Sequence, residues 1–113
     1  MLRRLYVKGS LTSTPEGVRF QLKNSLGSGY AKGMLPVSID EQQYPLEETC
    51  FIVDGAEVPF SSVSEEVPFT ISMNKVINIL VKGAALEPGL HKLEVGFVVP
   101  GLGKLRFNVK DTV

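Results

Sequence analysis

The chain has 113 residues, a length that supports one domain, which we expect to span residues 1–113. Twelve Lys and Arg side chains balance twelve Asp and Glu side chains, so the protein has no overall field that would attract nucleic acid or an anionic membrane surface. No segment approaches the roughly 20 apolar residues that cross a bilayer, and we therefore predict no nucleic-acid partner and no membrane contact.

The cysteine content and the lack of glycosylation motifs indicate a reducing compartment. Cys50 is the single cysteine and cannot form an internal disulfide, and the sequence contains no Asn-X-Ser/Thr motif. Residues 1–8 are basic but lack the apolar stretch of about 7 to 15 residues that a secretory signal needs. We therefore expect a cytoplasmic protein.

The strands predicted in the first half are short and separated by turn residues. Residues 12–17 carry Pro15 and Gly17 and indicate a turn, whereas residues 18–23 alternate apolar and polar side chains like a half-buried strand. Residues 24–33 are rich in Gly and Ser, which predicts a loop or bulge. The remaining elements of this half are strands over residues 2–8 and 35–39 and a polar turn over residues 40–43.

The strongest hairpin signal lies in the second half. Asp and Gly tolerate the positive φ of a two-residue turn, so Asp54-Gly55 should join a strand at residues 49–53 to one at residues 56–60. Pro68 marks residues 67–71 as an edge strand. The other strands expected are residues 76–81, 90–99 and 104–110, the last two joined across residues 100–103.

The last strand has the clearest alternation of all. A period of two places its polar and apolar residues on opposite faces, so this strand must cover a core. About eight or nine such short strands predict an all-β fold, an antiparallel β-sandwich of jelly-roll or immunoglobulin-like type. The alternating residues are Lys104, Arg106, Asn108 and Lys110 on one face and Leu105, Phe107 and Val109 on the other.

The chain offers few residues for catalysis or metal binding. His91 is the single histidine, and a zinc site needs three or four protein ligands, so we interpret it as a surface or hydrogen-bonded structural residue and the one candidate polar site. Cys50 would need His91 as its base and is expected to be a small buried apolar side chain. We predict no catalytic residue, no metal and no cofactor.

Two strands are apolar on both faces, whereas a two-layer sandwich needs to bury only one face of each sheet. These strands are residues 76–81 and residues 97–99, which lead into an apolar tip at residues 99–103. Either a partner or another part of the same chain covers the second face, and both alternatives stay open. The candidate interface residues are Ile77, Ile79, Val98, Val99, Pro100 and Leu102.

Three stretches resemble the small β subunits of bacterial C-glycoside deglycosidases and their uncharacterised relatives. The resemblance implies a β-sandwich accessory subunit that packs on a larger, sugar isomerase-like barrel subunit, to which the metal and the general base belong. It implies a place in carbohydrate metabolism and transfers no catalytic residue to this chain. The stretches are residues 35–46, beginning Leu35-Pro36-Val37, residues 51–58, Phe51-Ile52-Val53-Asp54-Gly55-Ala56-Glu57-Val58, and residues 86–96, which include Pro88-Gly89-Leu90-His91.

We therefore expect a non-catalytic accessory or interaction subunit. Its partner would be a protein, either a barrel-type enzyme subunit or a second copy of the chain in a homo-oligomer. The alternative is a stand-alone sandwich that binds a carbohydrate or another small ligand between the loops at residues 25–32 and 61–66. An enzyme acting by itself is the least favoured interpretation, because no nucleophile, base and orienting residue can be assembled from this inventory.

Overall fold

The computed structural model describes residues 5–23, 29–53, 55–64, 66–71, 76–101 and 103–113. Their strands form two antiparallel sheets that pack face to face, with one further short strand pair, so the predicted all-β sandwich is confirmed. These residues contain no α-helix, only 3-10 turns such as those at Leu46–Glu48 and Phe60–Ser62.

The first sheet has the strand order β1-β2-β10-β7-β8. The hairpin β7–β8 pairs Val53 with Ala56 across positions 54 and 55, which confirms the predicted two-residue turn, although Asp54 itself lies outside the described residues. The strands of this sheet are β1 (Thr12–Thr14), β2 (Gly17–Lys23), β10 (Val76–Lys82), β7 (Thr49–Val53) and β8 (Ala56–Pro59).

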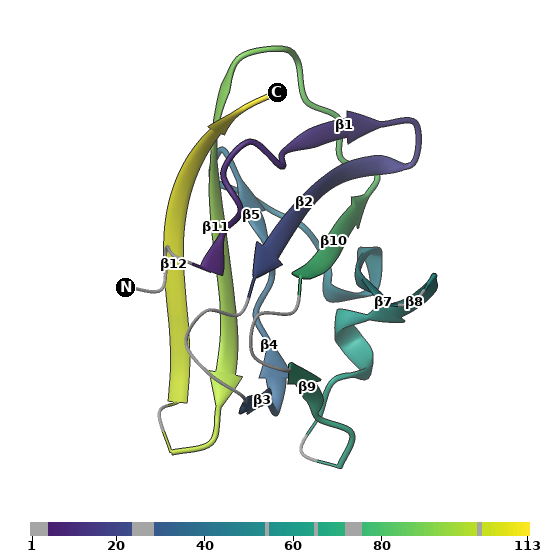
Figure 1. Ribbon diagram of the computed structural model, residues 1–113, viewed down its shortest axis with the longest axis vertical. Helices are drawn as coiled ribbons and strands as arrows, with labels where there is room; N and C mark the ends of the chain where they lie inside the picture. Colours follow the sequence, from purple (N-terminus) through teal and green to yellow (C-terminus); the bar gives the residue numbers. More distant parts are fainter. Residues whose placement is uncertain (1–4, 24–28, 54, 65, 72–75, 102) are drawn as a thin grey trace.

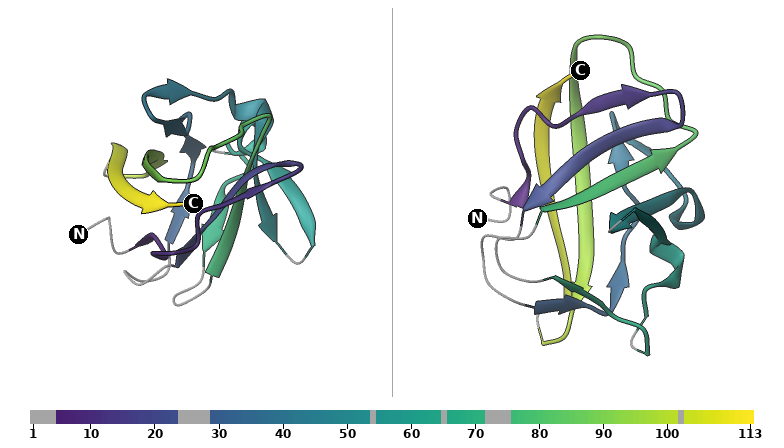
Figure 2. Two further views of the ribbon diagram at one scale, coloured as in Figure 1. Left: turned by 90° about the horizontal axis from the view of Figure 1, so that it is seen from above. Right: turned by 45° about the vertical axis from the view of Figure 1, so that its right-hand side comes forward.

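The second sheet has the order β12-β11-β5-β6, and β4 also pairs with β11. The long hairpin β11–β12 lies on one side of the molecule and β2 and β10 on the other (Figures 1 and 2). The hydrophobic core takes side chains from both sides. The strands here are β12 (Gly103–Thr112), β11 (Leu90–Val99), β5 (Ser38–Ile39), β6 (Gln42–Gln43) and β4 (Gly33–Met34), while β3 (Gly29–Ala31) pairs with β9 (Phe69–Ile71).

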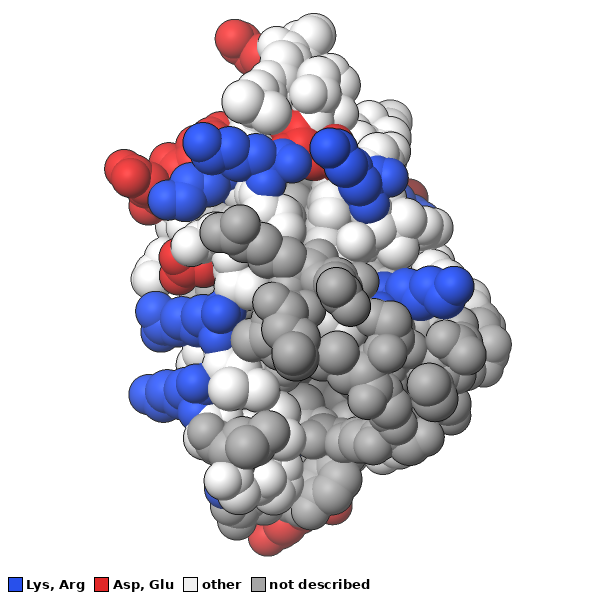
Figure 3. All heavy atoms as spheres, turned by 60° about the vertical axis from the view of Figure 1, so that its left-hand side comes forward, with Lys and Arg blue, Asp and Glu red and all other residues white. Residues whose placement is uncertain are grey.

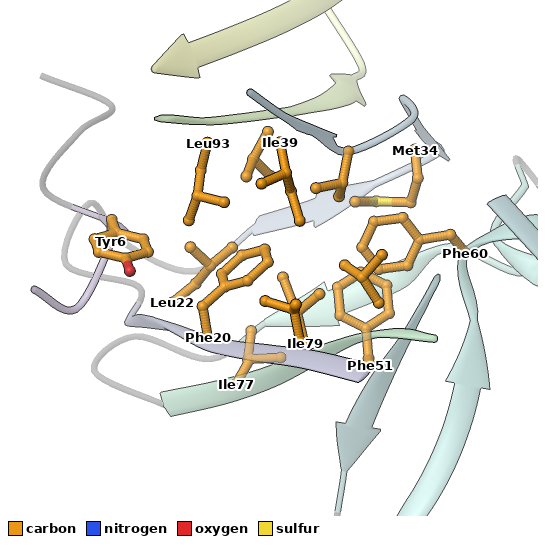
Figure 4. Close-up of a cluster of buried hydrophobic side chains, with 14 of the residues drawn as sticks. Tyr6, Phe20, Leu22, Met34, Ile39, Phe51, Phe60, Ile77, Ile79 and Leu93 are labelled. Atoms are coloured by element: carbon orange, nitrogen blue, oxygen red, sulfur yellow. The ribbon is translucent and has the colours of Figure 1, made fainter. Parts of the chain in front are cut away.

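The core forms because each sheet turns its alternate apolar residues toward the other. Side chains of β2, β7 and β10 point at those of β5 and β11, and Tyr6 and Phe60 lie at opposite ends of the cluster (Figure 4). Phe51 stacks on Phe69 with the ring centroids 3.8 Å apart. The largest fully buried side chains include Phe20, Phe51, Phe60, Ile39, Ile79 and Leu93.

The start of the chain differs from the prediction. In the described part of residues 2–8, Tyr6 makes a single bridge to Leu22 and no strand forms. The predicted turn at residues 12–17 is shorter than expected, because Thr12–Thr14 pairs with β2 as a strand. The Thr14 hydroxyl donates to the Gly17 carbonyl oxygen at 2.8 Å and closes a tight turn through Pro15 and Glu16.

The segment between β2 and β5 also differs from its prediction. The described part of the expected loop at residues 24–33 contains the short strands β3 and β4. Of the strand predicted at residues 35–39, Ser38 and Ile39 alone pair as a strand. Pro36 has no backbone N–H to donate to a sheet, which explains why regular pairing is interrupted there.

The second face of β10 is covered by the chain itself, which corrects one interpretation of its apolar sequence. Ile77 and Ile79 point into the core and are 3% and 0% exposed, so neither is available to a partner. Leu80 and Cys50 lie opposite each other on the outer face and are also buried. Arg19 of β2 lies directly opposite Leu80 in the register and has its side chain on the same face.

Gly17 lies against the backbone of β10 and leaves no room for a side chain. A Cβ atom at this position would lie 2.1 Å from the Val81 carbonyl oxygen, and its φ of +152° is one that other residues rarely adopt. We expect Gly17→Ala to lower the free energy of unfolding by about 2–4 kcal/mol, because backbone strain and overlap act together.

Gly89→Ala is the matched control for that measurement, since Gly89 has a φ of +134° and a Cβ atom there would meet no other atom within 4 Å. This variant should lose about 1 kcal/mol in urea denaturation, from backbone strain alone. Equal losses in the two variants would contradict the proposed overlap with Val81.

Candidate functional site

His91, the one histidine of the chain, connects three segments at the start of β11. Its Nδ1 atom lies 2.6 Å from a carboxylate oxygen of Asp40, and its Nε2 atom lies 2.7 Å from the backbone carbonyl oxygen of Glu87. Both partners are acceptors, and a histidine ring can donate from both nitrogens only when it is protonated. The geometry therefore favours the imidazolium form and agrees with a hydrogen-bonded structural role.

Asp40 and Glu41 form the tight turn between β5 and β6. Both have positive φ values, 51° and 72°, which are unusual for residues other than glycine. The second carboxylate oxygen of Asp40 accepts a hydrogen bond from the Lys92 backbone N–H at 3.0 Å. The carboxylate thus ties the strained turn to β11 at two points.

The His91–Asp40 contact makes stability depend on pH. The hydrogen bond to Asp40, together with the Glu87 carbonyl, raises the pKa of His91 above its ordinary 6.5, and the bond from His91 lowers the pKa of Asp40 below its ordinary 3.8. The stabilising effect of His91 is therefore complete below about pH 6.5 and is lost as the pH rises through its folded-state pKa. That of Asp40 is complete above about pH 3.8 and is lost as the pH falls through its folded-state pKa.

We expect Asp40→Asn to flatten the dependence of the melting temperature on pH between about pH 5 and 8. Asparagine tolerates positive φ and still accepts from the Lys92 N–H, so the substitution removes the charge and keeps the turn. Thermal unfolding of both proteins across this range tests the expectation. Parallel profiles would show that the carboxylate does not control the protonation of His91.

A polar hollow lies beside this contact on the outer face of the second sheet. Its volume is about 240 Å³, and it is lined by Ser38, Glu41, Lys92 and Glu94. Ser38 and Glu94 are directly paired across β5 and β11. No group of three metal-ligating side chains occurs in the described part of the chain. The lining has mixed charge and offers no aromatic surface on which a sugar ring would stack.

Four cations cover the outer face of the β11–β12 hairpin, and we call Lys92, Lys104, Arg106 and Lys110 the basic face. All four are exposed, and Lys and Arg side chains project in rows along the side of the surface formed by β12 (Figure 3). Arg106 forms an ion pair of 3.7 Å with Glu94. Lys92 and Lys110 lie directly opposite each other in the hairpin, and neither has an ion pair among the described residues. A neutral protein thus concentrates positive charge on one sheet face.

The Lys92–Lys110 pair should destabilise the isolated chain, because like charges directly opposite on one face repel. We expect Lys110→Glu to raise the free energy of unfolding by about 0.2–1 kcal/mol. Lys104→Glu is the control, since Lys104 lies opposite Val98 and has no charge to neutralise. Urea denaturation at low salt measures both, and an unchanged or lower stability for Lys110→Glu would contradict the repulsion.

Cys50 is not placed to act as a nucleophile. Its side chain is buried, and burial raises the pKa of the thiol, so it stays protonated near neutral pH. Cys50 belongs to β7 of the first sheet, whereas His91 belongs to β11 of the second. The ring nitrogens of His91 contact Asp40 and Glu87 instead.

The remaining predicted interface residues surround the end of the β11–β12 hairpin. Val98, Val99 and Pro100 are half-buried, and Leu102 lies outside the described residues. The Lys32 N–H donates to the Val98 carbonyl oxygen at 2.8 Å, and β4 pairs with the same part of β11. The chain therefore covers part of this tip itself, and what remains exposed is still a predicted contact surface.

Asp111 is a buried carboxylate that was not among the residues predicted from the sequence. It accepts hydrogen bonds from the Tyr6 hydroxyl at 2.6 Å and from the backbone N–H groups of Gly9 and Thr112 at 2.8 Å each. Burial opposes its charged form, but these bonds together outweigh burial and hold the pKa of Asp111 below its usual value. The alternation of β12 could have identified it, because Asp111 follows Leu105, Phe107 and Val109 on the inward face of the strand.

Comparison with known families decides which group of proteins the chain belongs to. A family model described as hydroxymethylglutaryl-CoA reductase, N-terminal domain, matches residues 1–113. The chain belongs to the hydroxymethylglutaryl-CoA reductase N-terminal domain family. A search of curated proteins finds no match to the sequence. In the described part of the chain, no helix is long and apolar enough to cross a membrane.

Membership of the reductase N-terminal domain family overturns the resemblance to C-glycoside deglycosidase subunits, which was wrong. The residues that carried the resemblance serve the turns of the sandwich: Gly89 has a φ of +134° before β11, and Gly55 has a φ of +81° between β7 and β8. Many β-sandwiches need such turns, so these residues do not identify one family. The expected sugar isomerase-like barrel partner depended on that resemblance and has no other support.

The alternative ligand site between two loops stays a prediction, because the structure does not describe the whole of either loop. Residues 25–28 and 65 of those loops lie outside the described residues. The polar hollow lies elsewhere, against β5 and β11.

Proposed function

We propose that this member of the reductase N-terminal domain family is a non-catalytic β-sandwich that binds an acidic protein surface through its basic face. The observation that carries the proposal is the direct Lys92–Lys110 pair, flanked by Lys104 and Arg106 on the same face. In the isolated chain this arrangement is repulsive, and an acidic partner surface relieves it. Surfaces that carry function often sacrifice stability in this way.

The chemistry of the described residues supports a role in binding. The ring nitrogens of His91 are both engaged by acceptors, and the thiol of Cys50 is buried in the other sheet. Asp111 is occupied by Tyr6 and two backbone N–H groups. A catalytic set needs a nucleophile and a base within hydrogen-bond reach, and these residues do not form one.

The partner that we propose is the rest of a hydroxymethylglutaryl-CoA reductase, whether in the same polypeptide or in a separate chain. The family description names that enzyme and assigns this domain to its N-terminal part. We place the interaction in the cytoplasm, because a single buried cysteine fits a reducing compartment.

Isothermal titration of the chain with the catalytic domain of the reductase from the same organism tests this function. We expect a complex whose affinity decreases with rising salt and decreases by about tenfold or more in the double variant Lys104→Glu/Lys110→Glu. Lys23→Glu, an exposed lysine of β2 on the other sheet, is the matched control and should change the affinity by less than about twofold.

Weaker binding by the double variant would not result from unfolding, since Lys110→Glu is expected to stabilise the isolated chain. No complex with the reductase, or a complex that the double variant leaves unchanged, would contradict the proposed function.

A further inference from the structure

β12 is a long edge strand that keeps the geometry needed to pair with another strand. Among the described strands it pairs with β11 alone, and the ten residue pairs from Leu90–Thr112 to Val99–Gly103 run without a bulge. Residues 103–112 contain no proline, so every backbone N–H in the strand is present. Bulges and prolines are two common devices that block edge pairing, and β12 uses neither.

The side chains of β12 divide into a charged face and an apolar face. Lys104, Arg106 and Lys110 point outward, whereas Leu105 and Val109 point inward and are half-buried. A charge that points inward would block an added strand. Between residues 104 and 110 the charges all point outward. They therefore leave the edge open to an added strand and favour one with the opposite charge.

The C-terminal end of β12 is in contact with another segment of the same chain. Asp111 is the inward charge there, and Tyr6 and Gly9 donate to its carboxylate, which holds the segment around residues 6–9 against this end. Among the described residues, none pairs with the outer edge of residues 104–110, which is the stretch considered for pairing.

We propose that residues 104–110 of β12 bind an extended segment of the partner in which acidic and apolar residues alternate, so that the segment becomes a further strand of the second sheet. Its acidic side chains would lie beside Lys104, Arg106 and Lys110, and its apolar side chains would extend the cover over Leu105 and Val109. Strand addition of this kind takes its affinity from backbone hydrogen bonds and its specificity from alternate side chains. This inference rests on the proposed function and specifies how the partner recognises the basic face.

A second copy of the chain is a poorer occupant of the same edge. Two copies of β12 paired across this edge would bring cations against cations, since Lys104, Arg106 and Lys110 lie on the outward face of each copy. Charge complementarity instead selects an acidic strand.

Three peptides added to the complete, isotope-labelled chain test the inference. The probe is a ten-residue peptide in which Glu alternates with Val; the first control alternates Lys with Val, and the second alternates Glu with Pro, which keeps the charge but cannot pair as a strand. Amide hydrogen exchange by NMR should show alternate β12 amides between residues 104 and 110 slowed by about tenfold or more with the Glu–Val peptide alone. The double variant Lys104→Glu/Lys110→Glu should abolish this protection, and Lys23→Glu should keep it.

The outcomes separate this inference from the proposed function. If the Glu–Pro peptide binds as well as the Glu–Val peptide, or β12 amides stay unprotected, strand addition is wrong even where the reductase still binds to the basic face. Protection by the Lys–Val peptide, or a dimer of the free chain in light scattering, would also overturn it. Protection by the Glu–Val peptide without any binding of the reductase supports strand addition and overturns the proposed function.

Discussion

The register of the β11–β12 hairpin is the constraint on which the rest of the molecule depends. Ten consecutive residue pairs place Leu93 and Val95 of β11 and Phe107 of β12 against the first sheet. A shift of one residue would exchange the faces of β12 and bring Arg106 toward the core. The apolar contacts with the first sheet therefore determine both the core and the position of the basic face, and one packing arrangement produces the two features.

The start of β11 combines a contact that stabilises the second sheet with a contact that does not. Asp40 and His91 hold a turn with two positive φ values, so charge and hydrogen bonding offset backbone strain there. Lys92, the next residue of β11, lies on the outer face directly opposite Lys110 of β12, and the two like charges repel each other. The Asp40–His91 contact is explained by the fold, because it stabilises the turn. The Lys92–Lys110 pair destabilises the isolated chain, and the proposed acidic partner would explain why it is present. This contrast is why the proposed function rests on the lysines and not on the histidine.

Much of the fold could be predicted because its signals are local. Strands 49–53 and 90–99 were predicted with their observed bounds, and the alternation from residue 104 to 110 specified which side chains lie outside. The prediction was wrong at the start of the chain: the described part of residues 2–8 makes a single bridge from Tyr6 to Leu22, and Thr12–Thr14 pairs with β2 in a local hairpin instead of lying in a turn. The candidate site was predicted less well. Nothing local to His91 identifies Asp40 as its partner, because 51 positions separate them along the chain.

By itself, the sequence determined the all-β class and which residues of the last strand face outward, because both follow from a period of two. Only the tertiary structure decided which apolar residues stay accessible. Ile77 and Ile79 are buried because the first sheet packs on the second, and Leu80 is buried on the opposite face of the same strand. Burial is a property of what packs on a strand from elsewhere in the chain, and a strand's own residues do not contain that information.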